Sequence, residues 1–150
     1  MESLRTRLWR HVFNLFPAYR GTGARVRYIA EDWSRVQVVI PRNWRTRNLV
    51  GTTFGGSIYG AVDPIYMVML KRRLGSAFTV WDKSAAIEFR QPGESDLYAD
   101  FRLPTAEIRE IRNSLDRGES MDREYEVEVV DDDGVVHATC EKTLYVRRDS

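Results

Sequence analysis

The sequence predicts an α+β fold in which a long antiparallel sheet curls around one buried helix. An amphipathic helix pattern occupies residues 2–16 and ends at Pro17. Alternating apolar and polar residues, the pattern of half-buried strands, occur twice before and four times after residues 57–75. That central segment is apolar on most sides, as expected of a buried helix. A chain of 150 residues is expected to form a single domain, residues 1–150.

The N-terminal helix carries its apolar side chains at spacings of three and four, which define one helical face. The opposite face is basic. We expect the apolar stripe to dock on the domain, the alternative being a helix that lies on a membrane surface. No apolar run approaches the roughly 18–20 residues that span a bilayer, so neither a membrane span nor a signal peptide is expected. The stripe consists of Leu4, Leu8, Val12, Leu15 and Phe16.

Six strands are expected, and the first two form a hairpin of residues 25–30 and 36–40. Residues 131–134, DDDG, join the last two strands, since Gly134 can take the positive φ that a tight turn needs. Between the fourth and fifth strands Thr105 can cap a short helix, an irregular loop being the alternative. The four later strands are Val80–Phe89, Leu97–Leu103, Glu124–Asp131 and Val135–Val146.

The charge balance and the cysteine count exclude several classes of function. The chain has 23 Lys and Arg against 22 Asp and Glu, so it lacks the basic field that drives nucleic-acid binding. Its one cysteine, Cys140, cannot form an internal disulfide and is expected in the core. One cysteine and two histidines cannot build a common zinc site. We therefore expect no nucleic acid, no metal and no cofactor, and a reducing, cytoplasmic compartment.

Residues 51–63, GTTFGGSIYGAVD, combine a paired glycine, the start of the central helix and one carboxylate. The segment is not a phosphate loop, because Ser57 stands where that motif requires lysine. Unpaired amide groups at a helix start favour an anion or a developing oxyanion, and glycine lets a ligand carbonyl approach the backbone. Asp63 lies two helical turns, about 10 Å, beyond Gly56. One chain cannot bring both to one atom, but a two-fold dimer can.

Asp63 also has a structural interpretation. Pro64 follows it, and Asp-Pro is a favourable N-cap and N1 pair, so Asp63 can begin a helix from Pro64 to Leu74. Residues 55–62 would then be a turn or a kinked first segment, since proline cannot donate to the helical ladder. The spacing alone favours this cap over a catalytic carboxylate.

Residues 48–63, NLVGTTFGGSIYGAVD, resemble the signature of hotdog-fold acyl-CoA thioesterases of the phenylacetate-degradation type. Within that superfamily the chain is most similar to the bacterial domain-of-unknown-function family 4442. The resemblance implies a hotdog fold, an antiparallel sheet wrapped around a central helix, here with an extra N-terminal helix. It also implies a homodimer or a dimer of dimers with active sites at the subunit interface. With the resemblance added, we favour Asp63 as a site residue.

The resemblance implies roles for individual residues of the motif. The Gly55 amide polarises the thioester carbonyl, and Asn48 positions the nucleophile or the thioester. Asp63 of the facing subunit is the nucleophile or general base, and Gly56 lies beside the substrate. One position departs from the family, because Phe54 stands where a histidine usually precedes the paired glycines. Phe54 can line an acyl pocket, but packing is the simpler role.

Three further groups are weaker candidates. A basic loop with Arg42, Arg45 and Arg47 precedes the central helix and can bind the phosphates of coenzyme A, although a solvated charge run is the favoured interpretation. Asp82, at the start of the third strand, can reach the helix start. His137, in the last hairpin, is expected to face solvent.

We therefore expect an enzyme that hydrolyses acyl-CoA or a related acyl thioester, with a carboxylate that attacks directly or activates water. The alternative is a non-catalytic hotdog module that binds acyl-CoA or another apolar ligand as a sensor or carrier. Phe54 favours the module, and Asp63 favours the enzyme. Dehydratases of this fold rank third, because they pair a histidine with a carboxylate and no histidine lies in residues 12–136.

Overall fold

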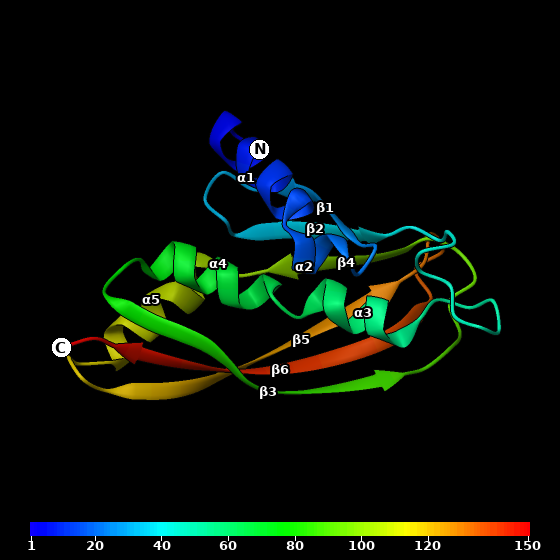
Figure 1. Cartoon of the computed structure of the whole chain (residues 1–150). Coiled ribbons are helices and arrows are strands. Elements are labelled where there is room, and N and C mark those ends of the chain that lie inside the picture. The colour runs from blue at the N-terminus through cyan, green and yellow to red at the C-terminus, as the bar shows by residue number, and fades with distance from the viewer.

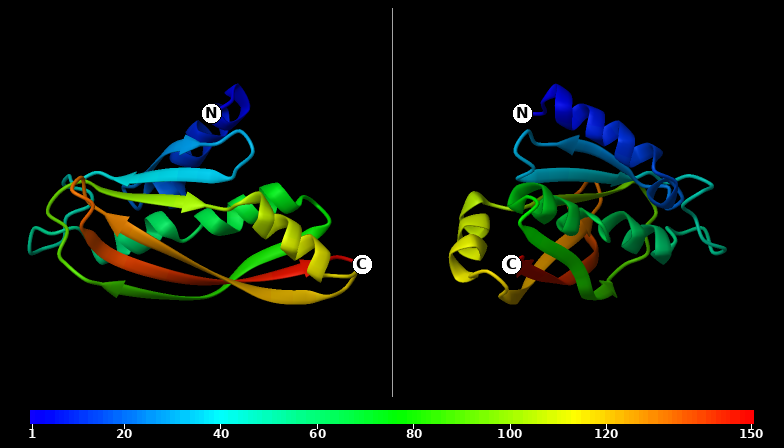
Figure 2. Two further views of the ribbon diagram at one scale, coloured as in Figure 1. Left: turned by 180° about the vertical axis from the view of Figure 1, so that it is seen from behind. Right: turned by 60° about the vertical axis from the view of Figure 1, so that its left-hand side comes forward.

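The computed structural model describes all 150 residues and contains helices and strands in the predicted order. Six antiparallel strands form one sheet in the order β1-β2-β4-β5-β6-β3, and the helices α3 (Gly55–Val62) and α4 (Ile65–Leu74) lie along its curved inner face (Figures 1 and 2). This arrangement confirms the predicted α+β architecture. No helix has the length and apolarity needed to cross a membrane. The strands are β1 (Arg25–Ile29), β2 (Arg35–Ile40), β3 (Phe78–Phe89), β4 (Leu97–Arg102), β5 (Ser120–Val130) and β6 (Val136–Arg148).

Two strands begin earlier than the sequence pattern predicted. β3 begins at Phe78 rather than Val80, and β5 begins at Ser120 rather than Glu124. The first residues of β5 pair with the end of β6 through backbone groups, which every residue carries, so polar side chains do not stop the ladder. Gly134 has a φ of 81°, as the predicted tight turn between β5 and β6 requires.

The segment between β4 and β5 is a helix, α5 (Thr105–Ser114). Of the two predicted alternatives, a short helix and an irregular loop, the helix is therefore confirmed. The expected cap was wrong, because Pro104 rather than Thr105 occupies the N-cap position. The Thr105 hydroxyl instead accepts a hydrogen bond from Arg73 Nη2 at 3.0 Å. Ile108 and Ile111 turn into the core and hold α5 against the sheet.

The central helix is interrupted at Asp63 and Pro64, which separate α3 (Gly55–Val62) from α4 (Ile65–Leu74). The interruption has a local cause, because proline has no amide hydrogen to donate to the helical ladder. Residues 55–62 are therefore the kinked first segment that was one of the predicted alternatives. Both halves are covered by the sheet, and their buried apolar residues are Ile58, Ala61, Val62, Ile65, Tyr66, Met69, Leu70 and Leu74.

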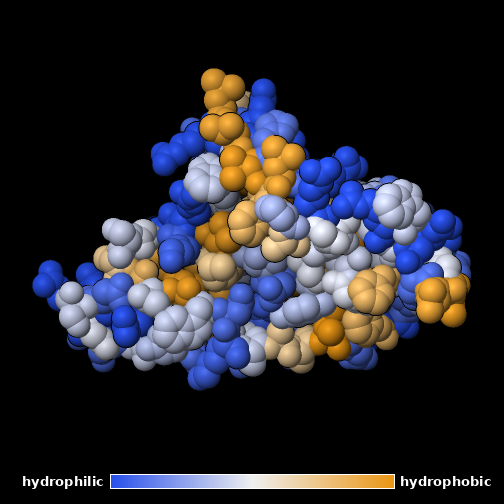
Figure 3. All heavy atoms as spheres, in the orientation of Figure 1, coloured by the Kyte–Doolittle hydropathy of each residue, from blue (hydrophilic) through white to orange (hydrophobic).

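The N-terminal helix α1 (Leu4–Leu15) docks by a different face from the one predicted. Trp9 and Phe13 pack against the core, and a short helix, α2 (Pro17–Arg20), follows. Figure 3 shows apolar side chains gathered over α1 at the top of the molecule. The prediction of a docked apolar stripe was wrong, since all five of its residues are exposed: Leu4 by 81%, Leu8 by 65%, Val12 by 48%, Leu15 by 66% and Phe16 by 61%.

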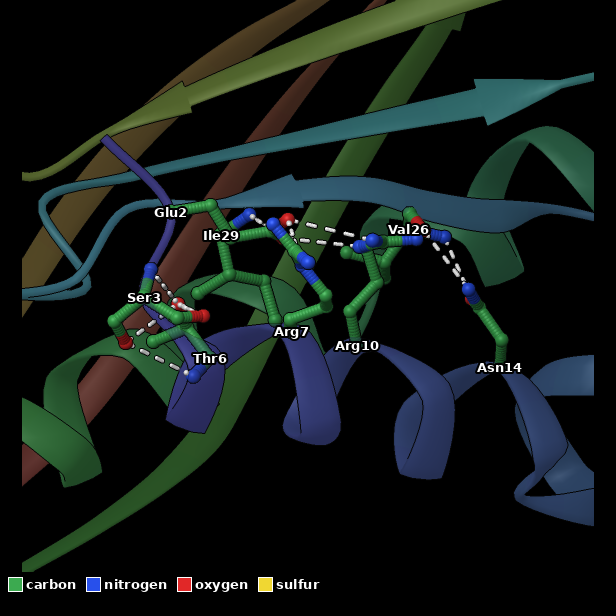
Figure 4. A network of polar contacts seen from close by, with 8 residues as sticks. All are labelled: Glu2, Ser3, Thr6, Arg7, Arg10, Asn14, Val26 and Ile29. Atoms are coloured by element: carbon green, nitrogen blue, oxygen red, sulfur yellow. Dashed lines mark hydrogen bonds and ion pairs between the residues drawn. The ribbon is translucent and has the colours of Figure 1, made fainter.

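Polar contacts with the edge strand β1 explain this orientation (Figure 4). Asn14 substitutes for a neighbouring strand: its Nδ2 donates to the Val26 carbonyl at 2.8 Å, and its Oδ1 accepts from the Val26 amide at 2.7 Å. Glu2 Oε1 accepts from Arg10 Nε at 2.9 Å and from the Ile29 amide at 3.4 Å. Unpaired edge groups of β1 thus find partners on α1 and on Glu2 just before it, which requires the polar side of the helix to face the sheet.

Replacing Asn14 with alanine should lower the free energy of unfolding by about 1–3 kcal/mol, because the Val26 amide and carbonyl lose their partners. His11→Ala, at an exposed position of the same helix, is the matched control and should change it by less than about 0.5 kcal/mol. Urea denaturation measures both. Equal effects of the two variants would show that packing alone holds α1.

Candidate functional site

The two parts of the predicted motif lie at separate cavities. Asn48 and Gly55 line a cavity of about 330 Å³ at the start of α3. Asp63 lines a second cavity, of about 470 Å³, between the N-terminal helices and the central helix. Within one chain the helix-start donor and the carboxylate therefore do not share a cavity.

The start of α3 carries two free hydrogen-bond donors. The amides of Gly55 and Gly56 have no backbone acceptor in the chain, as is general for the first turn of a helix. Both glycines are closely packed: a Cβ on Gly55 would lie 3.1 Å from the Phe89 ring, a contact that a small shift of the ring relieves, whereas one on Gly56 would overlap the Phe54 ring. Phe54 is 55% exposed and does not line the cavity beside Gly55. It packs over Gly56.

The Asn48 side chain is engaged in its own loop. Its Oδ1 accepts hydrogen bonds from the amides of Val50 at 3.0 Å and Thr52 at 3.1 Å, and its Nδ2 donates to Thr52 Oγ1 at 2.8 Å. Contacts of this kind fix a turn by replacing backbone hydrogen bonds. Asn48 therefore shapes the wall of the cavity beside Gly55, and its second Nδ2 hydrogen is free for a ligand.

Asp63 does not cap the helix that follows it. Its backbone is helical, with φ −46° and ψ −53°, and α4 begins after Pro64 without a side-chain cap. Its Oδ1 accepts hydrogen bonds from the Tyr59 hydroxyl at 2.8 Å and from Lys142 Nζ at 2.9 Å. The side chain is 45% exposed. One carboxylate oxygen is thus held by the protein, and Oδ2 is open.

Lys142 is a buried ammonium group shared by two carboxylates. Its side chain is 1% exposed, and Nζ lies 2.9 Å from Asp63 Oδ1 and 3.0 Å from Asp82 Oδ1. The contact with Asp82 is not aligned as a hydrogen bond, so it acts through charge. Burial by itself lowers the pKa of Lys142, but the two carboxylates outweigh burial and raise it. Burial raises the pKa of Asp82, and Lys142 opposes that shift.

Sequence reasoning missed Lys142 and Tyr59. The signal for Lys142 lies in the period-two pattern of β6, because it shares a strand face with Cys140 and Leu144, which are fully buried. Cys140 thus lies in the core as predicted, and an inward-pointing lysine two residues later requires an acidic partner. Asp82 likewise follows the inward face of β3, and it reaches Lys142 rather than the start of α3.

The other predicted candidates lie elsewhere. Arg45 and Arg47 are exposed, and Arg45 Nη2 donates to the Arg20 carbonyl at 3.2 Å. His137, expected to face solvent, is buried, with Nε2 2.8 Å from Asp131 Oδ2. That expectation was wrong because the tight turn between β5 and β6 brings the Asp131 side chain back onto the histidine.

Replacing Lys142 with methionine should destabilise the protein by about 1–3 kcal/mol near pH 7, because Asp63 and Asp82 then lack their shared cation. Without that cation the pKa of Asp82 rises further, which disfavours folding while Asp82 is ionised. The loss should therefore shrink as the pH falls through this raised pKa. Urea denaturation at about pH 7 and about pH 5 measures this dependence.

The matched control is Lys83→Met, which removes an exposed ion pair with Asp122 and should cost less than about 1 kcal/mol at either pH. A loss from Lys142→Met that does not depend on pH would contradict the charge-sharing role of Lys142.

The sequence matches the model of the family DUF4442, a domain of unknown function, over residues 5–146. No curated protein matches it. A similar solved structure is that of a Pseudomonas aeruginosa protein of unknown function, described as a probable thioesterase, with a TM-score of 0.83 and 21% identity over 97% of both chains.

Two further structures are similar to the chain. A thioesterase from Haemophilus influenzae has a TM-score of 0.71 and 15% identity over 99% of this chain and 92% of its own. A mutant of the phenylacetic acid degradation protein PaaI from Thermus thermophilus has a TM-score of 0.61 and 21% identity over 86% of this chain and 97% of its own. Likeness at such identities shows the fold, and it confirms the predicted hotdog fold with an added N-terminal helix.

Proposed function

The chain belongs to the DUF4442 family and has the hotdog fold, and on that premise we propose that it hydrolyses acyl thioesters, with acyl-CoA as the expected substrate. The carboxylate of Asp63 carries the proposal, since one of its oxygens is held by Tyr59 and Lys142 while the other is open. The free amide of Gly55 supplies the complementary donor. Two of the similar structures described above bear the name thioesterase, which agrees with this proposal.

The chemistry needs one carboxylate and one oxyanion donor. Asp63 Oδ2 attacks the thioester carbonyl carbon, or it takes a proton from a water molecule that attacks it. Negative charge then develops on the carbonyl oxygen, where the Gly55 amide donates a hydrogen bond. The carbon–sulfur bond breaks, and the thiolate leaves and takes up a proton that comes from water. After direct attack, a water molecule then hydrolyses the mixed anhydride between Asp63 and the acyl group, which releases the carboxylic acid and restores Asp63; when water attacks directly, Asp63 passes the proton it took to the thiolate. Tyr59 and Lys142 fix the direction of the carboxylate throughout.

The proposed active site needs two copies of the chain. Gly55 and Asp63 line different cavities, and a two-fold axis can bring Gly55 of one copy to Asp63 of the other. β3 is an edge strand of 12 residues with no neighbour on its outer side. An uncovered edge of that length can accept a strand from another copy. We therefore propose a homodimer, which can pair further into a dimer of dimers.

Asp63→Asn should lower turnover by several orders of magnitude, because the amide is a far poorer nucleophile and base. Stability should change little, since Asp82 still supplies a negative charge to Lys142 and the amide oxygen can still accept from Tyr59 and Lys142. Release of free thiol from acyl-CoA measures turnover, with Asp122→Asn, at an exposed ion pair, as the control. Wild-type turnover in Asp63→Asn would refute the proposed chemistry.

Gly55→Pro tests the oxyanion donor, because proline lacks the amide hydrogen yet is favoured at the first position of a helix. The preceding Phe54 already has the extended backbone that proline requires, with φ −64° and ψ 128°. We expect kcat to fall about 10²–10³-fold. Gly55→Ala is the matched control, since it places a similar Cβ near Phe89 but keeps the amide. If both variants lose equal activity, the Gly55 amide is not the donor.

The basic loop is proposed to bind the nucleotide part of coenzyme A. Changing both Arg45 and Arg47 to alanine should raise KM for acyl-CoA and leave an acyl thioester without the nucleotide unaffected, since only acyl-CoA brings phosphates. Steady-state kinetics on the two substrates measures the difference. Equal effects on both substrates, or none on either, would exclude this role.

Non-catalytic binding of acyl-CoA is the second candidate function, and two observations favour it. The cation of Lys142 partly neutralises Asp63, and Phe54 replaces the histidine that the thioesterase family usually has. Both features suit a sensor or carrier that holds a thioester without cleaving it. Wild-type protein that binds acyl-CoA but releases no thiol at any chain length would support this function over hydrolysis.

A further inference from the structure

We infer that the cavity between the N-terminal helices and the central helix binds the acyl chain of the substrate, an inference that rests on the proposed function. The cavity has a volume of about 470 Å³, within the roughly 300–1,000 Å³ of small-molecule sites. Eight of its 12 lining residues are hydrophobic. Val12 and Phe16 line one side, and Met67 and Val68 line the other. This lining matches an aliphatic chain of several methylene groups. Burial of such a chain is favourable in proportion to the apolar surface area that it removes from water.

The way in which α1 is attached explains why this cavity is not closed. Asn14 and Glu2 tie α1 to the edge strand β1, not to the central helix (Figure 4). α2 is held at the other end, where the Tyr19 hydroxyl donates to the Ala61 carbonyl at 2.8 Å. The two N-terminal helices are therefore anchored at the sheet and at the end of α3. The apolar side chains between these anchors line a space instead of filling it.

Gly60 sets the close approach at the α2 end of the cavity. A Cβ at this position would lie 2.6 Å from Thr22 Cγ2, so glycine lets the Thr22 side chain pack against α3 without a shift. Both residues line the cavity. The cavity is thereby bounded at one end by the contact between Gly60 and the Thr22 methyl group.

Asp63 orients the ligand, because it is the only charged side chain that lines this cavity. A thioester with its carbonyl carbon at Asp63 would place its methylene groups against Val12 and Met67. Methionine is flexible and adapts to chains of different shape. The free fatty acid produced by hydrolysis would bring a second carboxylate to Asp63, and like charges at short range repel. The cavity therefore favours the neutral thioester over the charged product.

The cavity beside Gly55 is unsuited to such a chain. Only two of its ten lining residues are hydrophobic, and Arg90 and Gln91 are among the others. In the proposed dimer the acyl chain thus lies in the copy that supplies Asp63, while the polar end of the substrate meets the Gly55 cavity of the other copy. The substrate class that follows is acyl thioesters with medium or long aliphatic chains.

Val12→Trp tests the inference, because it fills the cavity from an exposed position of α1. Each buried methylene is worth roughly fourfold in affinity, so wild-type kcat/KM should rise on the order of 100-fold or more from acetyl-CoA to dodecanoyl-CoA. Val12→Trp should lower the ratio of the dodecanoyl-CoA value to the acetyl-CoA value at least about tenfold. Leu8→Trp is the matched control, since Leu8 is exposed one turn earlier and does not line the cavity.

Ala18→Trp narrows the same cavity from α2 and should reproduce the effect if Val12→Trp folds poorly. A binding measurement separates this inference from the proposed function. S-dodecyl-coenzyme A, a thioether that cannot be hydrolysed, should bind the wild type and Leu8→Trp alike and bind Val12→Trp at least about tenfold more weakly by calorimetry.

The outcomes distinguish the two claims. Binding of the thioether that Val12→Trp weakens, in a wild-type protein that cleaves no thioester, would uphold the acyl-chain cavity and overturn the hydrolase proposal. Hydrolysis with the same kcat/KM at every chain length, unchanged by Val12→Trp and Ala18→Trp, would overturn the acyl-chain cavity and leave the hydrolase proposal intact.

Discussion

The buried charge of Lys142 fixes the relation between the sheet and the central helix. The Lys142 side chain extends from β6 toward the interruption of the central helix at Pro64. There its ammonium group donates a hydrogen bond to Asp63. An ammonium group at 1% exposure would cost several kcal/mol without a partner, so a shift of the helix along the sheet would be strongly unfavourable. The same contact that places the helix also directs the carboxylate that we propose as catalytic. Fold and site thus depend on one buried ammonium group, which Asp63 and Asp82 share.

The attachment of α1 likewise affects both the fold and the proposed site. Because Asn14 and Glu2 satisfy the edge of β1, the helix is anchored through polar contacts, and its leucines are not needed in the core. Two of the exposed apolar residues, Val12 and Phe16, line the cavity that Asp63 also lines. The cavity therefore arises from the way in which the chain protects a sheet edge, a need that any open sheet has.

The sheet and the central helix could be predicted from the sequence, because burial on one face imposes a period of two on strands and burial on all sides removes polar residues from a helix. The docked face of α1 could not be predicted in this way. The sequence pattern indicates only the most apolar face of the helix, whereas the observed orientation depends on the unpaired backbone groups of β1 that Asn14 binds. The motif indicated Asn48, Gly55 and Asp63. The partner of Asp63, 79 residues further along the chain, is set by strand order, which no local spacing encodes.

The shared active site is the central claim, and complementation between two inactive variants tests it most directly. Asp63→Asn and Gly55→Pro are purified separately, unfolded in urea, mixed in equal amounts and refolded. If each site takes its carboxylate from one copy and its amide donor from the other, half of the dimers are mixed, and each mixed dimer has one intact site. The account predicts recovery of roughly a quarter of wild-type turnover. A mixture as inactive as its two components, although mixed dimers form, would contradict a site built from two chains.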